Sequence, residues 1–415
     1  MTPIQSLEAG FDFGDGAFPV GRLAIDEERN VAVFEHDPRF ISSKLRVNPF
    51  FEENELIVAR APTFYNRLHG VFSDSLPDAW GRLIMRRKLA AQGIDYGSLG
   101  PLDKLALVGT RGMGALIYRP DADEPAAVPE VPDLDTLANE SLKILEGENS
   151  ESIIQLERLG GSSGGARPKL LVFMNDDAEI RTHSQSGFSP WIVKFRHTSD
   201  PIDAGPLEAA YADMARAAGI RVSSTRLIPS ACGPGYFATQ RFDRGIGGAR
   251  LHMVSAAAVF DVEWDGAAVD YTQLLNMARA VVGHSGVEEI FRRMLFNVLS
   301  TNRDDHARQH AFLMDKAGTW SLAPAYDLTF SYGRNGQHYL AVNNKGNEIT
   351  VGDIRHVARE HSIKNTDEII NEVAQAVDRF KEFAESYDVL PETQLLAERQ
   401  LRDRFNELGL AGYPR

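Results

Sequence analysis

Two short segments of the chain carry side chains that could move a proton and hold a metal ion. The first reads Asn302, Arg303, Asp304, Asp305, His306, Ala307, Arg308, Gln309 and His310, and the second reads Ala325, Tyr326, Asp327 and Leu328. Each acidic group follows an apolar segment. One carboxylate can then act as a base or orienting group while another binds a metal ion, as phosphoryl transfer requires. The pairing therefore indicates a kinase.

The spacing from Asp304 to Asp327 supports this interpretation. Kinases separate the catalytic aspartate from the metal-binding aspartate by a short hairpin. Residues 312–314 and 320–322 are apolar, and we expect them to form the two strands of that hairpin. The alternative for Asp304 is a loop that follows a helix and simply faces water.

A glycine-rich segment precedes these residues by more than a hundred positions. Residues 159–169 read Leu-Gly-Gly-Ser-Ser-Gly-Gly-Ala-Arg-Pro-Lys. Glycines allow positive φ and a close approach of amide groups to an anion, so the segment could cradle a phosphate. It is not a P-loop, because Lys169 follows a proline and precedes a leucine. A flexible hairpin connection has a similar composition, and the sequence leaves both interpretations open.

Lys194 interrupts the apolar run at residues 191–195. A charged side chain in such a strand must be paired or must contact a ligand, and a nucleotide phosphate could supply the partner. The alternative is a lysine on the solvent side of an alternating strand, which the strand pattern by itself favours.

The segments that must position these residues differ along the chain. Short alternating runs up to about residue 118 predict strands, and apolar residues at helical spacing follow Pro77. Two apolar segments near 170 and 192 predict an antiparallel pair, and the signal from about Met253 onward is almost wholly helical. We therefore predict an α+β, two-lobed fold with a mixed α/β N-terminal lobe and an all-α C-terminal lobe. The expected domains are an N-terminal α+β subdomain, a kinase N-lobe and a helical C-lobe, at residues 1–125, 126–250 and 251–415.

Composition excludes several classes of protein. A chain of 415 residues exceeds the size of one core, and 44 basic against 58 acidic residues give a net charge of -14, which disfavours direct nucleic-acid binding by the whole chain. Cys232 is the only cysteine, so an intrachain disulfide and a cysteine metal cluster are impossible. The N-terminus lacks a signal pattern, and no apolar run approaches a membrane span. We expect a cytoplasmic protein without a membrane partner.

Taken together, the motifs resemble those of the HipA-like serine/threonine kinases, which are toxins of bacterial toxin-antitoxin modules. Residues 70–82, which read Gly-Val-Phe-Ser-Asp-Ser-Leu-Pro-Asp-Ala-Trp-Gly-Arg, are similar to the family's signature ahead of the kinase core. Five motifs then occur in the family's order, namely the loop at 164–169, the strand with Lys194, the segment 240–244, the loop with Asp304 and the pair Tyr326-Asp327. The resemblance covers nearly the whole chain.

The resemblance implies ATP and Mg²⁺ as cofactors and gives each motif a role. Lys194 and the loop with Gly164–Gly165 would contact the nucleotide phosphates. Gln240 and Phe242 would lie at the hinge against adenine, and Tyr326 would pack near the nucleotide. Asp304 would serve as the catalytic base, and Asp327 would serve as the magnesium ligand.

Gln309 departs from the family pattern. Family members have asparagine there as a second metal ligand. Glutamine keeps the carboxamide oxygen on a longer stem, while magnesium demands near-ideal octahedral geometry, and the neighbouring His310 offers nitrogen instead of oxygen. Gln309 is therefore compatible with two hypotheses. The chain is either an active or impaired kinase, or a pseudokinase that binds nucleotide and antitoxin without phosphotransfer.

The resemblance also implies partners and regulation. Ser162 matches the loop serine that the family autophosphorylates, with Ser163 as the alternative, and a phosphate there would repel the phosphates of the nucleotide. The protein substrate would be a translation component such as an aminoacyl-tRNA synthetase. A helix-turn-helix antitoxin of the HipB type would restrain the kinase, and contact with DNA would come mainly through that partner.

A different enzyme class is the third interpretation. Asp304, Asp305, His306 and Asp327 could be ligands in a metal-dependent phosphohydrolase. That interpretation gives no role to Lys194 or to the glycine-rich segment.

Overall fold

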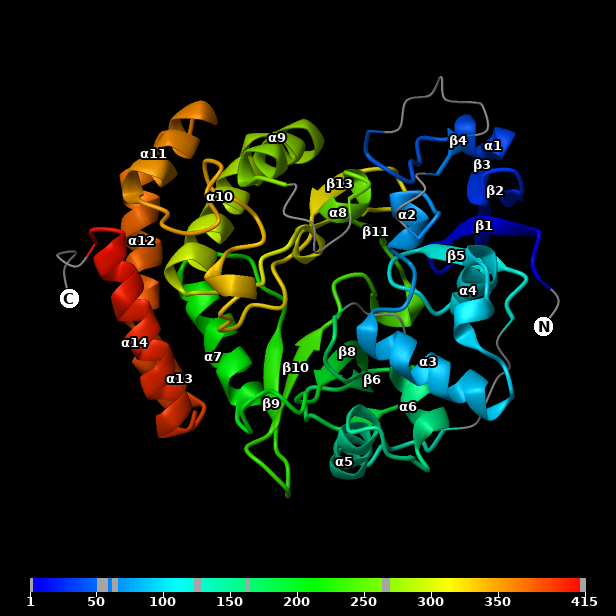
Figure 1. Cartoon of the computed structure of the whole chain (residues 1–415), viewed down its shortest axis with the longest axis horizontal. Coiled ribbons are helices and arrows are strands. Elements are labelled where there is room, and N and C mark those ends of the chain that lie inside the picture. The colour runs from blue at the N-terminus through cyan, green and yellow to red at the C-terminus, as the bar shows by residue number, and fades with distance from the viewer. Residues whose placement is uncertain are drawn as a thin grey trace. The chain divides into compact units, whose positions relative to one another are not determined.

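The computed structural model describes residues 3–50, 59–61, 66–122, 128–160, 165–262 and 269–410. The chain divides into two compact units, each made of separate stretches of sequence. Figure 1 labels the helices and strands described below. Unit 1 consists of Met1–Asp200, Ala238–Val262 and Phe312–Trp320, and unit 2 consists of Pro201–Phe237, Glu263–Ala311 and Ser321–Arg415. The three domain ranges expected from the sequence stay a prediction. The expected α+β class is confirmed, since strands and helices both occur throughout.

Unit 1 begins with an antiparallel five-stranded sheet in the order β4-β3-β2-β1-β5. Its strands are β1 (Ser6–Asp12), β2 (Ala17–Asp26), β3 (Val31–His36), β4 (Ala59–Arg60) and β5 (Leu116–Arg119). Alternate side chains of β1 such as Leu7, Ala9 and Phe11 are buried, which is the pattern of a sheet with one face in the core. The strands expected in this part of the chain are confirmed.

The helices of unit 1 also bury apolar side chains. They are α1 (Pro38–Ile41), α2 (Gly70–Ser73), α3 (Ala79–Ala91), α4 (Pro101–Val108), α5 (Leu134–Leu145), α6 (Ile153–Gly160) and α8 (Ala256–Val259), and short 3₁₀ turns occur at η1 (Tyr96–Ser98) and η2 (Ile246–Gly248). The helix expected after Pro77 is α3, which buries Trp80, Ile84 and Leu89 on one face. The Asp78 side chain accepts a hydrogen bond from the Gly81 amide and so caps the start of the helix.

A second five-stranded sheet has the order β7-β6-β8-β10-β9. Its strands are β6 (Lys169–Met174), β7 (Ile180–Arg181), β8 (Ser189–Lys194), β9 (Thr225–Ile228) and β10 (Tyr236–Gln240). The expected antiparallel pair is confirmed as β6 and β8, with Lys169 directly opposite Lys194. The expected hairpin near residue 316 is also confirmed, because β11 (His252–Ser255), β12 (Ala311–Met314) and β13 (Trp320–Leu322) form a three-stranded sheet in chain order.

Unit 2 is mainly helical. Its helices are α7 (Ala204–Ala217), α9 (Tyr271–Val282), α10 (His284–Leu299), α11 (Val351–Glu360), α12 (Thr366–Asp378), α13 (Phe380–Ser386) and α14 (Pro391–Glu407), with 3₁₀ turns at η3 (Ala307–Gln309) and η4 (Arg334–Gly336). The helical periodicity expected for α10 is confirmed, and Ile290, Phe291, Met294, Leu295, Val298 and Leu299 are fully buried. This buried helix leads directly into the loop with Asp304. Among the described helices, none combines the length and the apolar character that crossing a bilayer requires.

Candidate active site

The loop with Asp304 starts immediately after α10. The backbone turns at Thr301, whose φ is 56°, and the Thr301 carbonyl accepts a hydrogen bond of 3.0 Å from the Ser331 amide. Asn302 then forms a parallel bridge with Ser331. These contacts fix the direction in which the chain leaves the buried helix.

Asp305 anchors the loop to the interior of unit 2. Its carboxylate is fully buried and accepts hydrogen bonds from the Tyr271 hydroxyl at 2.9 Å, from His338 Nδ1 at 2.9 Å, and from the amides of Tyr339 and Leu340 at 2.9 and 3.4 Å. Burial and the neighbouring Asp305 raise the pKa of Tyr271 well above its usual value, so this hydroxyl stays a donor. Asp305 is therefore a structural carboxylate.

Asn302, which precedes Asp304 in the chain, is also held by hydrogen bonds. Asn302 Nδ2 donates to Asn297 Oδ1 at 3.0 Å, and Asn297 Nδ2 donates to the Tyr271 hydroxyl at 3.0 Å. The same tyrosine holds Asp305, so one buried network fixes residues on both sides of Asp304. Asp304 itself is only partly buried. The Asp304 carboxylate is thus held on a fixed loop and still reaches the surface. This placement suits a catalytic base, because the base must contact the acceptor hydroxyl.

The second predicted segment is tied to the first by side chains. Gln309 Nε2 donates to Asp327 Oδ2 at 2.8 Å, and the Tyr326 hydroxyl donates to the Arg308 carbonyl at 2.5 Å. The Ala323 amide donates to the Ala311 carbonyl at 2.9 Å, which closes the hairpin between the two segments. The structure thus brings together Gln309, Tyr326 and Asp327, three of the residues singled out in the sequence.

Asp327 and Gln309 form a donor set that fits magnesium. Mg²⁺ prefers oxygen ligands, and a carboxylate and a carboxamide both offer oxygen. In the present arrangement Gln309 turns its NH₂ group toward Asp327. A half-turn of the amide would instead present Oε1 beside the carboxylate. Asp327 has a φ of 59°, a strained conformation for a residue other than glycine that its local contacts must hold.

Most of the residues expected to bind nucleotide, Tyr326 excepted, lie in unit 1. Lys194 ends β8, where it is partly buried. Gln240 ends β10, and the amide of the next residue donates to the carbonyl of Pro190 at 2.9 Å, near the start of β8. The four-residue step from Pro190 to Lys194 spans about 13 Å of strand. Gln240 and Lys194 are therefore near opposite ends of one strand, an arrangement that suits an extended ligand with a base at one end and phosphates at the other.

The glycine-rich segment is described only in part. Ser162, Ser163 and Gly164 lie outside the described residues. Gly165 has a φ of 103°, a conformation that side chains rarely adopt, which supports the expectation of an unusual backbone here. After it, Arg167 makes a bidentate pair with Asp200 at 2.7 and 2.9 Å.

Comparison with known proteins identifies the family. Residues 161–381 match the model of the HipA-like C-terminal domain, and residues 16–119 match the model of the HipA N-terminal domain. The chain belongs to the HipA-like family. No curated protein matches it in a sequence search.

One solved structure shows the same fold over its whole length. The HipA chain of a complex from Shewanella oneidensis MR-1, described as a toxin-antitoxin system of HipA, HipB and its operator DNA, is 16% identical with a TM-score of 0.70, and the match covers 99% of this chain and 100% of that chain. The Helicobacter pylori proinflammatory kinase CtkA is 13% identical with a TM-score of 0.38, over 56% of this chain and 92% of that one. The HipA fold therefore extends over the whole chain.

Two histidines of the Asp304 loop, the buried His310 and the partly buried His306, have lowered pKa values. Burial lowers the pKa of His306 to about 4 and the pKa of His310 to about 3, and Arg293 adds to the effect at His310. Both rings are therefore neutral near pH 7. A neutral imidazole at His306 suits a structural role in the loop.

The buried histidines predict a pH-dependent stability. An unfolded histidine takes up a proton near pH 6.5, whereas His310 in the folded protein resists protonation down to about pH 3. The unfolded state therefore binds more protons below pH 6.5, and the free energy of unfolding should fall from pH 7 to pH 5 by about 1–2 kcal/mol for each such histidine. His310→Gln should remove that much of the pH dependence, as urea unfolding at the two pH values can measure. An unchanged difference between the two pH values would contradict the assignment.

Sequence reasoning missed the role of Asp243. Its carboxylate is fully buried and contacts Arg241 at 2.9 and 2.7 Å, Arg244 at 2.8 Å and the Gly114 amide at 2.9 Å. Burial alone would raise the pKa of Asp243, but the two guanidinium groups hold it well below the usual range. The segment 240–244 thus contains a buried ion network next to the predicted hinge residues Gln240 and Phe242. The charged residues at 241, 243 and 244 were the available signal.

Proposed function

We propose that this HipA-like chain is an ATP- and Mg²⁺-dependent protein serine/threonine kinase and the toxin of a toxin-antitoxin module. The observation that carries the proposal is the connection between the two acidic segments of unit 2. Gln309 contacts Asp327 at 2.8 Å, and Tyr326 holds the Arg308 carbonyl. Asp304 stands on the same braced loop with its side chain partly exposed. A base and a metal-binding carboxylate held in this way are the parts that phosphoryl transfer needs.

Each site residue would have its own role in phosphoryl transfer. Asp304 would accept the proton of the acceptor hydroxyl and orient it, while Asp305 keeps the loop in place. Asp327 and Gln309 would hold magnesium, which when bound neutralises charge on the nucleotide phosphates. Lys194 would place a positive charge against those phosphates.

The nucleotide would lie along unit 1. The loop with Gly164–Gly165 would turn backbone amides toward the phosphates. Gln240 and Phe242 would contact adenine at the end of β10, and Tyr326 would pack near the nucleotide. Autophosphorylation at Ser162, or at Ser163, would bring negative charge into a loop that binds phosphate and would switch the kinase off.

The proposed partners are those that the family resemblance implies. The Shewanella protein is described with HipB and operator DNA. We propose that this chain likewise binds a helix-turn-helix antitoxin of the HipB type in the cytoplasm, and that the antitoxin makes most of the contact with DNA. The net charge of -14 suits that division. The proposed protein substrate is a translation component such as an aminoacyl-tRNA synthetase.

An experiment that traces the γ-phosphate of ATP would test the proposed function. Purified protein, freed of phosphate by a phosphatase, would be incubated with γ-labelled ATP and Mg²⁺, alone and with a cell lysate. The kinase predicts label on the protein or on lysate proteins and none with Asp304→Ala. Label in neither would refute phosphotransfer, whereas nucleotide binding without transfer would support the pseudokinase.

The longer side chain of Gln309 keeps the pseudokinase as a second candidate. Its amide lies 2.8 Å from Asp327 Oδ2, so the two side chains are close enough to share a metal ion only if the amide presents its oxygen. If the longer stem limits metal geometry, Gln309→Asn should raise kcat by roughly 3- to 30-fold, or about 0.7–2 kcal/mol of barrier. Initial rates at saturating ATP, measured over a range of Mg²⁺ concentrations, would test this. An unchanged or lower rate would count against metal geometry as the limitation.

The phosphohydrolase receives less support. It requires Asp305 as a metal ligand, but four hydrogen bonds already occupy that buried carboxylate. Release of inorganic phosphate from small esters, without phosphorylation of protein, would be the result that revives it.

A further inference from the structure

The N-terminal signature motif makes a buried ion pair that the proposed chemistry does not use. Asp78 Oδ1 caps α3, while Asp78 Oδ2 accepts a hydrogen bond of 2.9 Å from Lys169 Nζ. The two side chains are 5% and 3% exposed, and 91 residues separate them in the chain. Lys169 is the first residue of β6 and the residue at which the glycine-rich segment ends. The signature motif thus holds one end of that segment.

The position of Lys169 explains why a negative charge is needed there. Lys169 and Lys194 are direct partners in the β6–β8 pair, so their side chains leave the sheet on the same face. Like charges directly opposite each other destabilise a sheet. Asp78 pairs with Lys169 and so offsets the repulsion between the two lysines. The ion pair therefore lies beside the residue proposed to bind the nucleotide phosphates.

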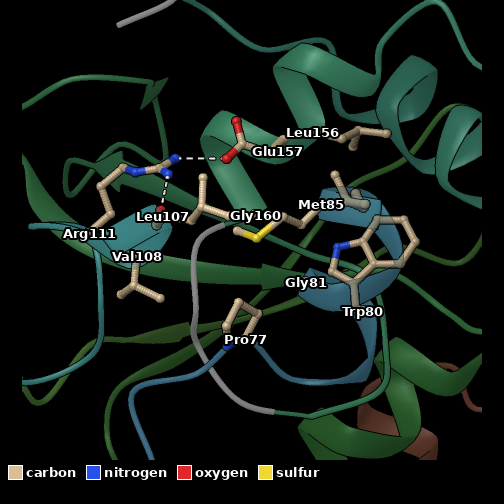
Figure 2. A pocket seen from close by; sticks show the side chains of 11 residues that line it. Pro77, Trp80, Gly81, Met85, Leu107, Val108, Arg111, Leu156, Glu157 and Gly160 are labelled. Atoms are coloured by element: carbon tan, nitrogen blue, oxygen red, sulfur yellow. Dashed lines mark hydrogen bonds and ion pairs between the residues drawn. The ribbon is translucent and has the colours of Figure 1, made fainter. Parts of the chain in front are cut away.

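The other end of the segment is attached to α3 and α4 through Glu157. This buried carboxylate of α6 contacts Lys88 Nζ at 3.0 Å and Arg111 Nη1 at 2.9 Å. Lys88 belongs to α3, and Arg111 follows α4. Figure 2 shows the Arg111–Glu157 pair beside a pocket that is lined by side chains of α3, α4 and α6.

Gly160, where the glycine-rich segment leaves α6, lies close to Lys169, where the segment joins β6. This last residue of α6 also lines the pocket, together with Trp80 of the signature motif (Figure 2). A Cβ added to Gly160 would lie 3.6 Å from Trp80 Nε1 and 3.6 Å from the Lys169 carbonyl oxygen. The segment between Gly160 and Lys169 therefore starts and ends against the same helix.

We propose that the signature motif is a clamp that positions the glycine-rich segment for nucleotide binding, with Asp78 as its main positioning residue. The loop clamp consists of the Asp78–Lys169 pair and of Glu157 with Lys88 and Arg111. It sets where the segment leaves α6 and where it joins β6 at Lys169, directly opposite Lys194. The inference deepens the proposed kinase function and rests on it for its link to ATP.

The double variant Asp78→Asn/Lys169→Met tests the clamp. Asparagine keeps the cap of α3, and the second change avoids leaving a buried lysine without a counter-charge. We expect the KM for ATP and the Kd for a fluorescent ATP analogue to rise by roughly 5- to 20-fold, with kcat at saturating ATP within about 2-fold of the original. Faster amide hydrogen exchange at residues 156–160 and 165–170 of the nucleotide-free protein should accompany the change. Glu157→Gln tests the other attachment and should act in the same direction if the double variant fails to fold.

Asp353→Asn/Lys345→Met is the matched control. This pair also joins a lysine Nζ to a helix-capping aspartate at 2.9 Å, but it belongs to unit 2 and to neither end of the segment. The clamp predicts that only the Asp78 and Glu157 variants change ATP affinity and exchange at the segment. Equal values in wild type and both clamp variants would overturn the inference. Faster exchange in the variants, together with a wild type that binds no nucleotide, would uphold the clamp and refute the kinase function instead.

Discussion

Asp304→Asn should lower the rate of phosphoryl transfer by roughly 10²- to 10⁴-fold, the usual contribution of a general base. The amide cannot accept the proton of the acceptor hydroxyl. The loop should survive the change, because Asp305 and Asn302 keep the buried hydrogen bonds that hold it. ATP affinity and the melting temperature should therefore stay close to those of the wild type, and single-turnover kinetics at saturating ATP would isolate the loss in kcat.

The adjacent carboxylate provides the comparison. Asp305→Asn replaces a fully buried acceptor of hydrogen bonds from Tyr271 and His338. This variant should lose stability as well as activity, since a neutral amide with two N–H donors cannot satisfy that set of donors. The account would be contradicted if Asp304→Asn kept more than about a tenth of the rate, or if it lost as much stability as Asp305→Asn.

Asp243→Ala should lower the free energy of unfolding by about 3–5 kcal/mol, the usual effect of removing one partner of a buried ion pair. Alanine would leave Arg241 and Arg244 buried without their counter-charge and would remove the acceptor of the Gly114 amide. Chemical denaturation followed by circular dichroism would measure the loss.

A partly exposed ion pair in the same unit is the control. Asp200 pairs with Arg167, whose side chain is 38% exposed, and such pairs contribute about 0–1 kcal/mol. Asp200 also accepts from the His197 amide at 2.8 Å, so its replacement by alanine should cost somewhat more than the ion pair alone. A loss for Asp243→Ala no greater than the loss for Asp200→Ala would show that the buried network does not stabilise unit 1.

The local parts of the site were predictable from the sequence. Apolar periodicity identified α10 and the strands of the β12–β13 hairpin, and the spacing of Asp304 and Asp327 placed them on either side of it. These features depend on neighbours in the chain, which the sequence displays directly. The family resemblance is likewise confirmed by two domain models. The catalytic and nucleotide-binding roles of the site residues stay predictions.

The supporting contacts were not predictable in the same way. Asp305 and Asp304 are adjacent and chemically identical, yet one is fully buried and the other reaches the surface. What separates them is the convergence of donors from Tyr271 and from residues 338–340, more than thirty positions away. The pairing of Asp78 with Lys169 spans 91 residues and has no periodic signal at all. Long-range ion pairs of this kind appear only when the fold is known.

Intact mass spectrometry of phosphatase-treated protein, before and after incubation with ATP and Mg²⁺, tests the central claim most directly. The account predicts added phosphate on the wild type, located at Ser162 or Ser163, and none on Asp304→Asn. An unchanged mass for the wild type, with no label transferred to lysate proteins, would contradict the proposal that this HipA-like chain is a working kinase.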